Sequence, residues 1–184
     1  MEKYKNLLEK GCCNFEITDS KILRSLEQIS KSEHFESKNW KFLRWCHWGI
    51  EFLNHEEAID FIQEYKDLRE PSQVYFQKPI DKCENVYTKT ISDEIKNYVS
   101  EAYGLNKSEI EQPGIQLNIY LNGFHIRNHR DGGDGGQTRI SAVLIYMNEC
   151  EGGELVIHGG EETITPKLGR VVMIDLTKHD IEHA

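Results

Sequence analysis

Residues 115–121, I-Q-L-N-I-Y-L, alternate in polarity and indicate the fold of the second part of the chain. Ile115, Leu117, Ile119 and Leu121 share one face, and the intervening side chains face the other way. A period of two residues is typical of a β-strand with one buried face. We therefore predict a half-buried strand here.

Further apolar runs follow this strand towards the C-terminus. They are R-I-S-A-V-L-I-Y-M at 139–147, E-L-V-I-H at 154–158 and R-V-V-M-I-D-L at 170–176. Turns that are rich in glycine or contain proline separate the runs. Several short strands at such close spacing predict a sandwich or barrel.

Helical patterns dominate the preceding residues. Residues 20–29 carry apolar side chains at helical spacing. Asn54 is placed to cap a following helix, with Glu57 as its reciprocal partner. A third helix is predicted to start at Ser92 and to stop at Gly104.

The order of these elements suggests one α+β domain. Two short runs, at 74–76 and 85–88, are rich in β-branched or aromatic residues and are predicted as strands. Residues 1–112 are expected to form a supporting region of helices and strands, and residues 113–184 the β core. The length of 184 residues suits a single domain with a real core.

Composition excludes several classes of protein. The net charge of −9 argues against broad contact with nucleic-acid phosphates. No apolar run approaches the roughly 20 residues of a membrane span, and the charged N-terminus does not read as a signal peptide. The five cysteines are odd in number and include no Cys-x-x-Cys, which favours reduced thiols. We expect a cytoplasmic protein without nucleic-acid or membrane partners; the sequence does not indicate an oligomeric state.

The stretch N-H-R-D-G-G-D-G-G, residues 128–136, contains the strongest candidate for chemistry. On a strand, His129 and Asp131 point to the same side and can offer a nitrogen and a carboxylate oxygen to one cation. Two histidines and one carboxylate form the facial ligand set of non-heme Fe(II) oxygenases. Such a short motif also fits a polar surface turn, so the rest of the chain must distinguish the two interpretations.

The order of motifs after residue 115 resembles the 2-oxoglutarate and Fe(II)-dependent oxygenases, in their prolyl 4-hydroxylase-like branch. Y-L-N-G-F-H-I-R-N-H-R-D is followed by R-I-S-A-V-L-I-Y-M-N, G-G-E-L-V-I, T-P-K-L-G-R-V-V-M-I and a histidine. The resemblance covers residues 115–184 and implies an oxidoreductase on a double-stranded β-helix, a jelly-roll-like core with the N-terminal helices packed outside. It also implies Fe(II) and the cosubstrate 2-oxoglutarate, and suggests ascorbate as a further cofactor.

The resemblance assigns roles to individual positions of this chain. His129 and Asp131 fall on the first two iron ligands. Tyr146 falls on the tyrosine that hydrogen-bonds the far carboxylate of 2-oxoglutarate, and Tyr120 on a tyrosine that contacts the same cosubstrate. Arg139 matches an arginine near the pocket mouth and is a candidate contact to the substrate.

Two histidines compete for the third ligand position. His183 lies nearest the family spacing after Pro166, and I-E-H-A reads as the start of a strand. His179 lies in the polar stretch T-K-H-D. We therefore predict His129, Asp131 and His183 as the catalytic metal site. The resemblance also implies that the glycine-rich residues 132–136 form a mobile connection that closes over substrate, and glycine permits the turns this requires.

The chain departs from the family after the third ligand. Family members have a further strand that carries an Arg or Lys, and this residue pairs with the far carboxylate of 2-oxoglutarate. The sequence ends at Ala184, so we expect a truncated or trimmed chain. Arg139 as a substitute anchor, or a protein that no longer uses 2-oxoglutarate, are the alternatives.

The sequence leads to three functional hypotheses. The first is a dioxygenase that hydroxylates a C–H bond of a prolyl or other residue in a protein or peptide. The second is a hydroxylase of a free amino acid or small metabolite. The third belongs to a different class: a catalytically inactive binding module that kept the fold.

Overall fold

The computed structural model describes residues 2–32, 41–46, 49–65, 74–79, 86–111, 113–120, 125–126, 128–131, 139–157, 161–179 and 181–184. The chain forms two compact units that interleave along the sequence. The first comprises Met1–Ser32, Lys82–Pro113 and Asn128–Ala184, and the second Glu33–Asp81 and Gly114–Arg127. Among the described helices, none combines the length and the apolar character needed to span a membrane.

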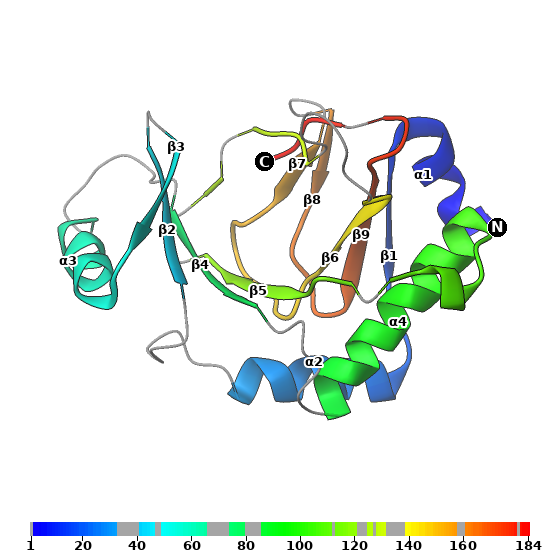
Figure 1. The fold of residues 1–184 in the computed structure, drawn as a ribbon, viewed down its shortest axis with the longest axis horizontal. Helices are drawn as coiled ribbons and strands as arrows, with labels where there is room; N and C mark the ends of the chain where they lie inside the picture. The colour runs from blue at the N-terminus through cyan, green and yellow to red at the C-terminus, as the bar shows by residue number, and fades with distance from the viewer. Residues whose placement is uncertain are drawn as a thin grey trace. The chain divides into compact units, whose positions relative to one another are not determined.

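A three-stranded antiparallel sheet forms one layer of the first unit (Figure 1). β9, Arg170–Asp175, lies in the middle, between β1, Cys12–Glu16, and β6, Ser141–Ile145. Residues 171–174 of β9 are fully buried. The central position thus explains why V-V-M-I is a continuous apolar run rather than an alternating one.

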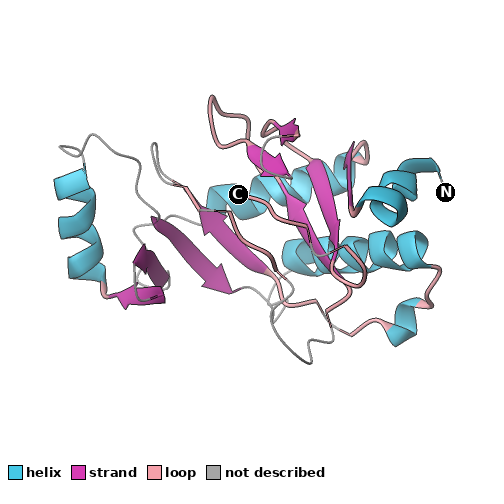
Figure 2. Ribbon diagram, turned by 90° about the horizontal axis from the view of Figure 1, so that it is seen from above, coloured by secondary structure: helices cyan, strands magenta, loops and turns pink. Residues whose placement is uncertain are grey.

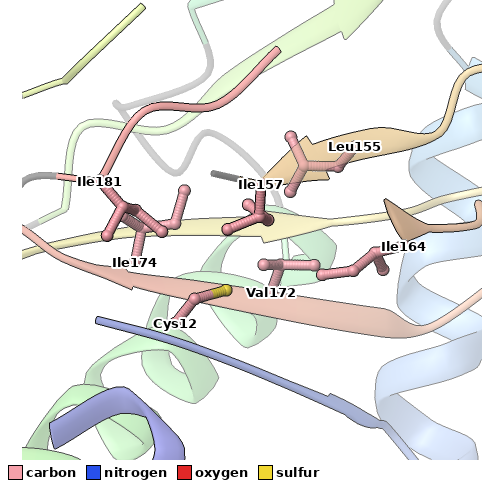
Figure 3. Packing of buried hydrophobic residues seen from close by; sticks show 7 residues of the cluster. All are labelled: Cys12, Leu155, Ile157, Ile164, Val172, Ile174 and Ile181. Atoms are coloured by element: carbon pink, nitrogen blue, oxygen red, sulfur yellow. The ribbon is translucent and has the colours of Figure 1, made fainter. Parts of the chain in front are cut away.

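A second layer faces this sheet. β7, Leu155–Ile157, pairs antiparallel with β8, Glu162–Ile164, and His183 extends the layer by bridges to Ile157 and His129. The apolar cluster in Figure 3 comprises Cys12, Leu155, Ile157, Ile164, Val172, Ile174 and Ile181. Each such buried aliphatic side chain contributes about 1.5–3 kcal/mol. The segment that ends in His183 is therefore tied to the core through Ile181.

Helices cover the outer face of the three-stranded sheet. Phe15 alternates with the inward-facing residues of β1, and its ring lies 5.1 Å from the ring of Tyr98 on α4. α2 packs along α4 (Figure 2). The helical elements of this unit are η1, Glu2–Tyr4; α1, Lys5–Lys10; α2, Ser20–Ser32; α4, Val86–Tyr103; and η2, Lys107–Glu109.

The second unit contains a four-stranded antiparallel sheet and one helix. The strands are β2, Lys41–Cys46; β3, Gly49–Leu53; β4, Val74–Pro79; and β5, Gln116–Ile119, in the order β3-β2-β4-β5. α3, His55–Tyr65, follows β3. The cap predicted for this helix is confirmed: Asn54 Oδ1 accepts from the backbone of Glu57 at 3.0 Å, and Glu57 Oε2 accepts from the backbone of Asn54 at 2.8 Å.

The prediction for α4 needs one correction. The helix begins at Val86, so the strand predicted at 85–88 is wrong for residues 86–88, and Ser92 lies inside the helix. Thr88 and Ser92 are buried on the face of the helix that packs inward. This tertiary packing outweighs the β-propensity of V-Y-T at residues 86–88. The end at Gly104 is confirmed, since this glycine has a φ of 67°.

Candidate metal centre

His129 and His183 lie side by side on neighbouring strand segments. The backbone N–H of His129 donates to the carbonyl of His183 at 2.8 Å, and the N–H of His183 donates back at 3.0 Å. Two residues that exchange both bonds in an antiparallel pair project their side chains to one face. The two imidazole centroids accordingly lie 4.4 Å apart.

Asp131 completes the group because it follows His129 by two residues. Its Oδ1 lies 3.5 Å from Nε2 of His129, and its Oδ2 lies 3.7 Å from Nε2 of His183. One ligand atom from each of the three residues lies within 4.8 Å of the other two. The structure thus brings together the three residues that the sequence predicted as ligands.

The side chain of His183 is buried and oriented. It is 4% exposed, and its Nδ1 lies 3.2 Å from the carbonyl oxygen of Ile181. Metal-bound histidines characteristically donate their second ring N–H to such a carbonyl. With Nδ1 turned to this carbonyl, Nε2 is the ring nitrogen that faces Asp131.

The surroundings of Asp131 favour its ionised form. The hydrogen bond with His129 is the largest influence and lowers the pKa of the carboxyl group. The charges of His183 and Arg139 act in the same direction, and together these effects outweigh the opposing effect of burial. The group therefore offers two imidazole nitrogens and one carboxylate, which is the donor set of non-heme Fe(II) oxygenases.

The spacing of these donors also suits a divalent cation. Ligand bonds of about 2.1 Å at right angles place neighbouring donor atoms about 3 Å apart. The contacts of Asp131 with the two histidines are slightly wider than this, at 3.5 and 3.7 Å. Small side-chain rotations close that gap, so the three residues fit a cation that keeps other coordination positions open.

Tyr146 follows β6 and packs against the apolar cluster in the interior of the first unit. Its backbone N–H donates to the carbonyl of Arg170 at 2.9 Å, which continues the pairing of β6 with β9. Burial is the main reason that the pKa of Tyr146 rises to about 12, although the charge of Arg170 opposes the shift. Its hydroxyl is therefore a hydrogen-bond donor at neutral pH.

The remaining predicted residues differ in their placement. Arg139 lies beside the group, and its Nη2 donates to the carbonyl of Asp131 at 3.4 Å. Tyr120 directly follows β5 in the second unit and is 42% exposed. The predicted mobile connection at 132–136 lies outside the described residues.

His179 and Asp175 occupy the turn that precedes His183. Nε2 of His179 lies 3.2 Å from the carbonyl of Leu8, and this histidine is not part of the three-residue group. Sequence reasoning missed Asp175, whose carboxylate is buried at the end of β9. The available signal was an acidic residue that closes an otherwise apolar run.

Comparison with known proteins shows two similarities. Residues 115–184 match the model described as the 2OG-Fe(II) oxygenase superfamily. A prolyl-4-hydroxylase from Pseudomonas putida has a similar structure, with a TM-score of 0.68 and 14% identity over 99% of this chain and 88% of that chain. No curated protein sequence gives a significant match.

The structure mixes helices and strands as the sequence predicted, and these findings imply the double-stranded β-helix fold. At 14% identity the structural likeness concerns the fold, and the family match concerns the region that contains the candidate metal centre. Residues 115–184, which carry His129, Asp131 and His183, are thus similar to the 2OG-Fe(II) oxygenase superfamily, and the fold of the chain resembles that of a prolyl-4-hydroxylase.

Proposed function

We propose that this protein is an Fe(II)- and 2-oxoglutarate-dependent dioxygenase that hydroxylates a prolyl or other residue in a protein or peptide, with Fe(II) held by His129, Asp131 and His183. The observation that carries the metal assignment is the convergence of these three side chains on one space. The choice of a peptide substrate is supported by the similarity to a prolyl-4-hydroxylase. A free amino acid or small metabolite is the second candidate substrate.

Among the proposed ligands, Asp131 contributes charge and His183 contributes a fixed orientation. When bound, Fe(II) and 2-oxoglutarate supply the oxygen-dependent oxidation of a C–H bond, with conversion of 2-oxoglutarate to succinate. Asp131 contributes the negative charge that offsets part of the charge of the cation. His183 is held by its contact with the carbonyl of Ile181 and by burial, which also keeps water from that side of the centre.

Two tyrosines and one arginine are proposed to bind the organic ligands. Tyr146 donates its hydroxyl to the far carboxylate of 2-oxoglutarate, and its raised pKa supports this role as a donor. Tyr120 is proposed as a second cosubstrate contact. Arg139 is exposed next to Asp131 and is proposed to bind the substrate at the entrance.

A succinate assay tests the proposed substrate class. The protein is incubated with Fe(II), 2-oxoglutarate and ascorbate, together with either a library of proline-containing peptides or free amino acids. Peptide-dependent succinate, with a peptide mass gain of one oxygen atom, is the expected result. His129→Ala is the matched control and should abolish both signals.

The other outcomes separate the alternatives. Stimulation by free amino acids alone would replace the peptide substrate by a small molecule. Absence of succinate under all conditions, in protein that still binds Fe(II), would favour the inactive binding module.

A further inference from the structure

The path of the chain between β9 and His183 determines where the third proposed ligand lies. β9 ends at Asp175, residues 176–179 form a turn, and the chain then returns to bridge His129. Ile181 enters the apolar cluster on the way. The backbone conformation of this turn therefore determines where Nε2 of His183 lies relative to Asp131.

Asp175 closes the turn with a buried carboxylate. The residue is 1% exposed. Its Oδ1 accepts from the hydroxyl of Thr177 at 2.7 Å and from the backbone N–H of Thr177 at 3.1 Å, and its Oδ2 accepts from the backbone N–H of Lys178 at 3.2 Å. A buried carboxylate with this many donors fixes the local backbone, because breaking the contacts leaves a charge without compensation.

The same carboxylate also ties the turn to α4. The hydroxyl of Tyr103, at the end of α4, lies 3.0 Å from Oδ1 of Asp175. Burial by itself raises the pKa of Asp175, but the hydrogen bonds from Thr177 and Tyr103 outweigh it and lower the pKa. Asp175 is therefore ionised in the folded chain, as its set of donors requires.

Backbone contacts with Gly11 and Ile140 hold the start of the turn. The backbone N–H of Asp175 donates to the carbonyl of Gly11 at 2.9 Å, and the N–H of Leu176 donates to the carbonyl of Ile140 at 3.1 Å. Gly11 has a φ of 84°, and a Cβ at this position would lie 2.4 Å from Cβ of His179. The turn is thus fixed from both sides.

We propose that Asp175 is a positioning residue for the metal centre, because its carboxylate closes the turn that places His183 beside His129 and Asp131. Asp175 does not contact the cation in this arrangement. It acts through the backbone of residues 176–179. The inference rests on the proposed metal site.

Mn(II) affinity and the Co(II) absorption spectrum test the proposal in the full chain. Asp175→Asn keeps the size of the side chain but removes the charge and one acceptor. We expect Mn(II) affinity to fall by about 10- to 100-fold, as for other residues that orient metal ligands. The ligand-field bands of bound Co(II) should shift, because His183 no longer sits in its original place.

Val172→Ala is the control for a purely structural effect. It removes buried volume from the same strand and leaves the hydrogen bonds of the turn intact. All proteins are measured at a temperature at which circular dichroism shows them folded. Val172→Ala should bind Mn(II) as the parent does. Equal loss of affinity in both variants, or parental affinity and an unchanged Co(II) spectrum in Asp175→Asn, would overturn the proposal.

Thr177 provides a second test that does not touch the buried charge. Thr177→Val removes the hydroxyl that donates to Asp175, and Thr177→Ser retains it. Because Thr177 is exposed, both variants should fold even if Asp175→Asn does not. We expect Thr177→Val to lose less Mn(II) affinity than Asp175→Asn, and Thr177→Ser to keep parental affinity. Equal affinity in the two Thr177 variants would reject the role of the turn.

A separate variant tests the metal site itself. If His129→Ala binds Mn(II) as the parent does, the proposed metal site is wrong.

Discussion

The two segments that form the candidate metal centre differ in how the chain holds them. In the segment 181–184, Ile181 and His183 are each 4% exposed, and its backbone bonds to His129 on one side and Val156 on the other. In the segment 128–131, the side chains of His129 and Asp131 are 24% and 28% exposed. One proposed ligand is therefore built into the core, whereas the other two lie on a more open strand. Metal affinity and fold stability should respond differently to changes in the two segments.

Removal of the carboxylate should have the largest effect. Asp131→Ala eliminates the one anionic ligand, and we expect Fe(II) or Mn(II) affinity to fall by at least about 100-fold. Calorimetric titration of the metal-free protein measures this loss. Unchanged affinity would show that the group of three is not the metal site.

Substitution of the two histidines should have similar effects on metal affinity but different effects on the free energy of unfolding. Both His129→Ala and His183→Ala should abolish tight metal binding. In the metal-free protein, His183→Ala should lower the free energy of unfolding by about 1–3 kcal/mol, because it empties a buried position. His129→Ala should cost less, since this side chain is partly exposed. Urea unfolding in the presence of a chelator makes the comparison; equal losses would mean that the segments are held alike.

Tyr146→Phe should act on the cosubstrate and spare the metal. A hydrogen bond to a charged group contributes about 1.5–3 kcal/mol, so the apparent 2-oxoglutarate constant should rise by roughly ten- to a hundredfold. Titration of 2-oxoglutarate into the Mn(II)-loaded protein gives this constant directly. If it stays the same while Mn(II) affinity is parental, Tyr146 does not hold the far carboxylate.

His179→Ala should have the smallest effect on the metal. Its imidazole contacts the carbonyl of Leu8 and lies outside the three-residue group. We expect parental Mn(II) affinity and a loss of stability of about 0.5–1.5 kcal/mol, the net value of one hydrogen bond. If His179→Ala loses metal binding while His183→Ala retains it, the third ligand is His179 and not His183.

The sequence predicted the elements whose patterns are local. α2 follows helical spacing, the Asn54 cap depends on residues three apart, and β5, β6 and β9 follow alternation or continuous apolar runs. β1, with the sequence C-C-N-F-E, has no such pattern. It exists because it pairs with β9, more than 150 residues away, and distant pairing leaves no trace in a short window of sequence.

The candidate site was predictable to a similar extent. Spacing and the family resemblance selected His129, Asp131 and His183, and the structure brings these three together. Their role as metal ligands stays a prediction, as do the roles of Tyr120, Tyr146 and Arg139. Asp175 was missed because its importance lies in the donors that surround it, and Tyr103 and Thr177 approach it only in the folded chain.

The bridge between His129 and His183 joins positions that are 54 residues apart in sequence (183 − 129). A cation held by both histidines and Asp131 would link the two ends of the chain segment 129–183. In the unfolded chain these residues are far apart and do not form the site. At a free concentration one hundred times its dissociation constant, such a ligand stabilises the folded chain by about 2.7 kcal/mol. Changes of 1–2 kcal/mol alter cellular abundance several-fold. If Fe(II) is this cation, as proposed, the abundance of the protein should follow the iron supply.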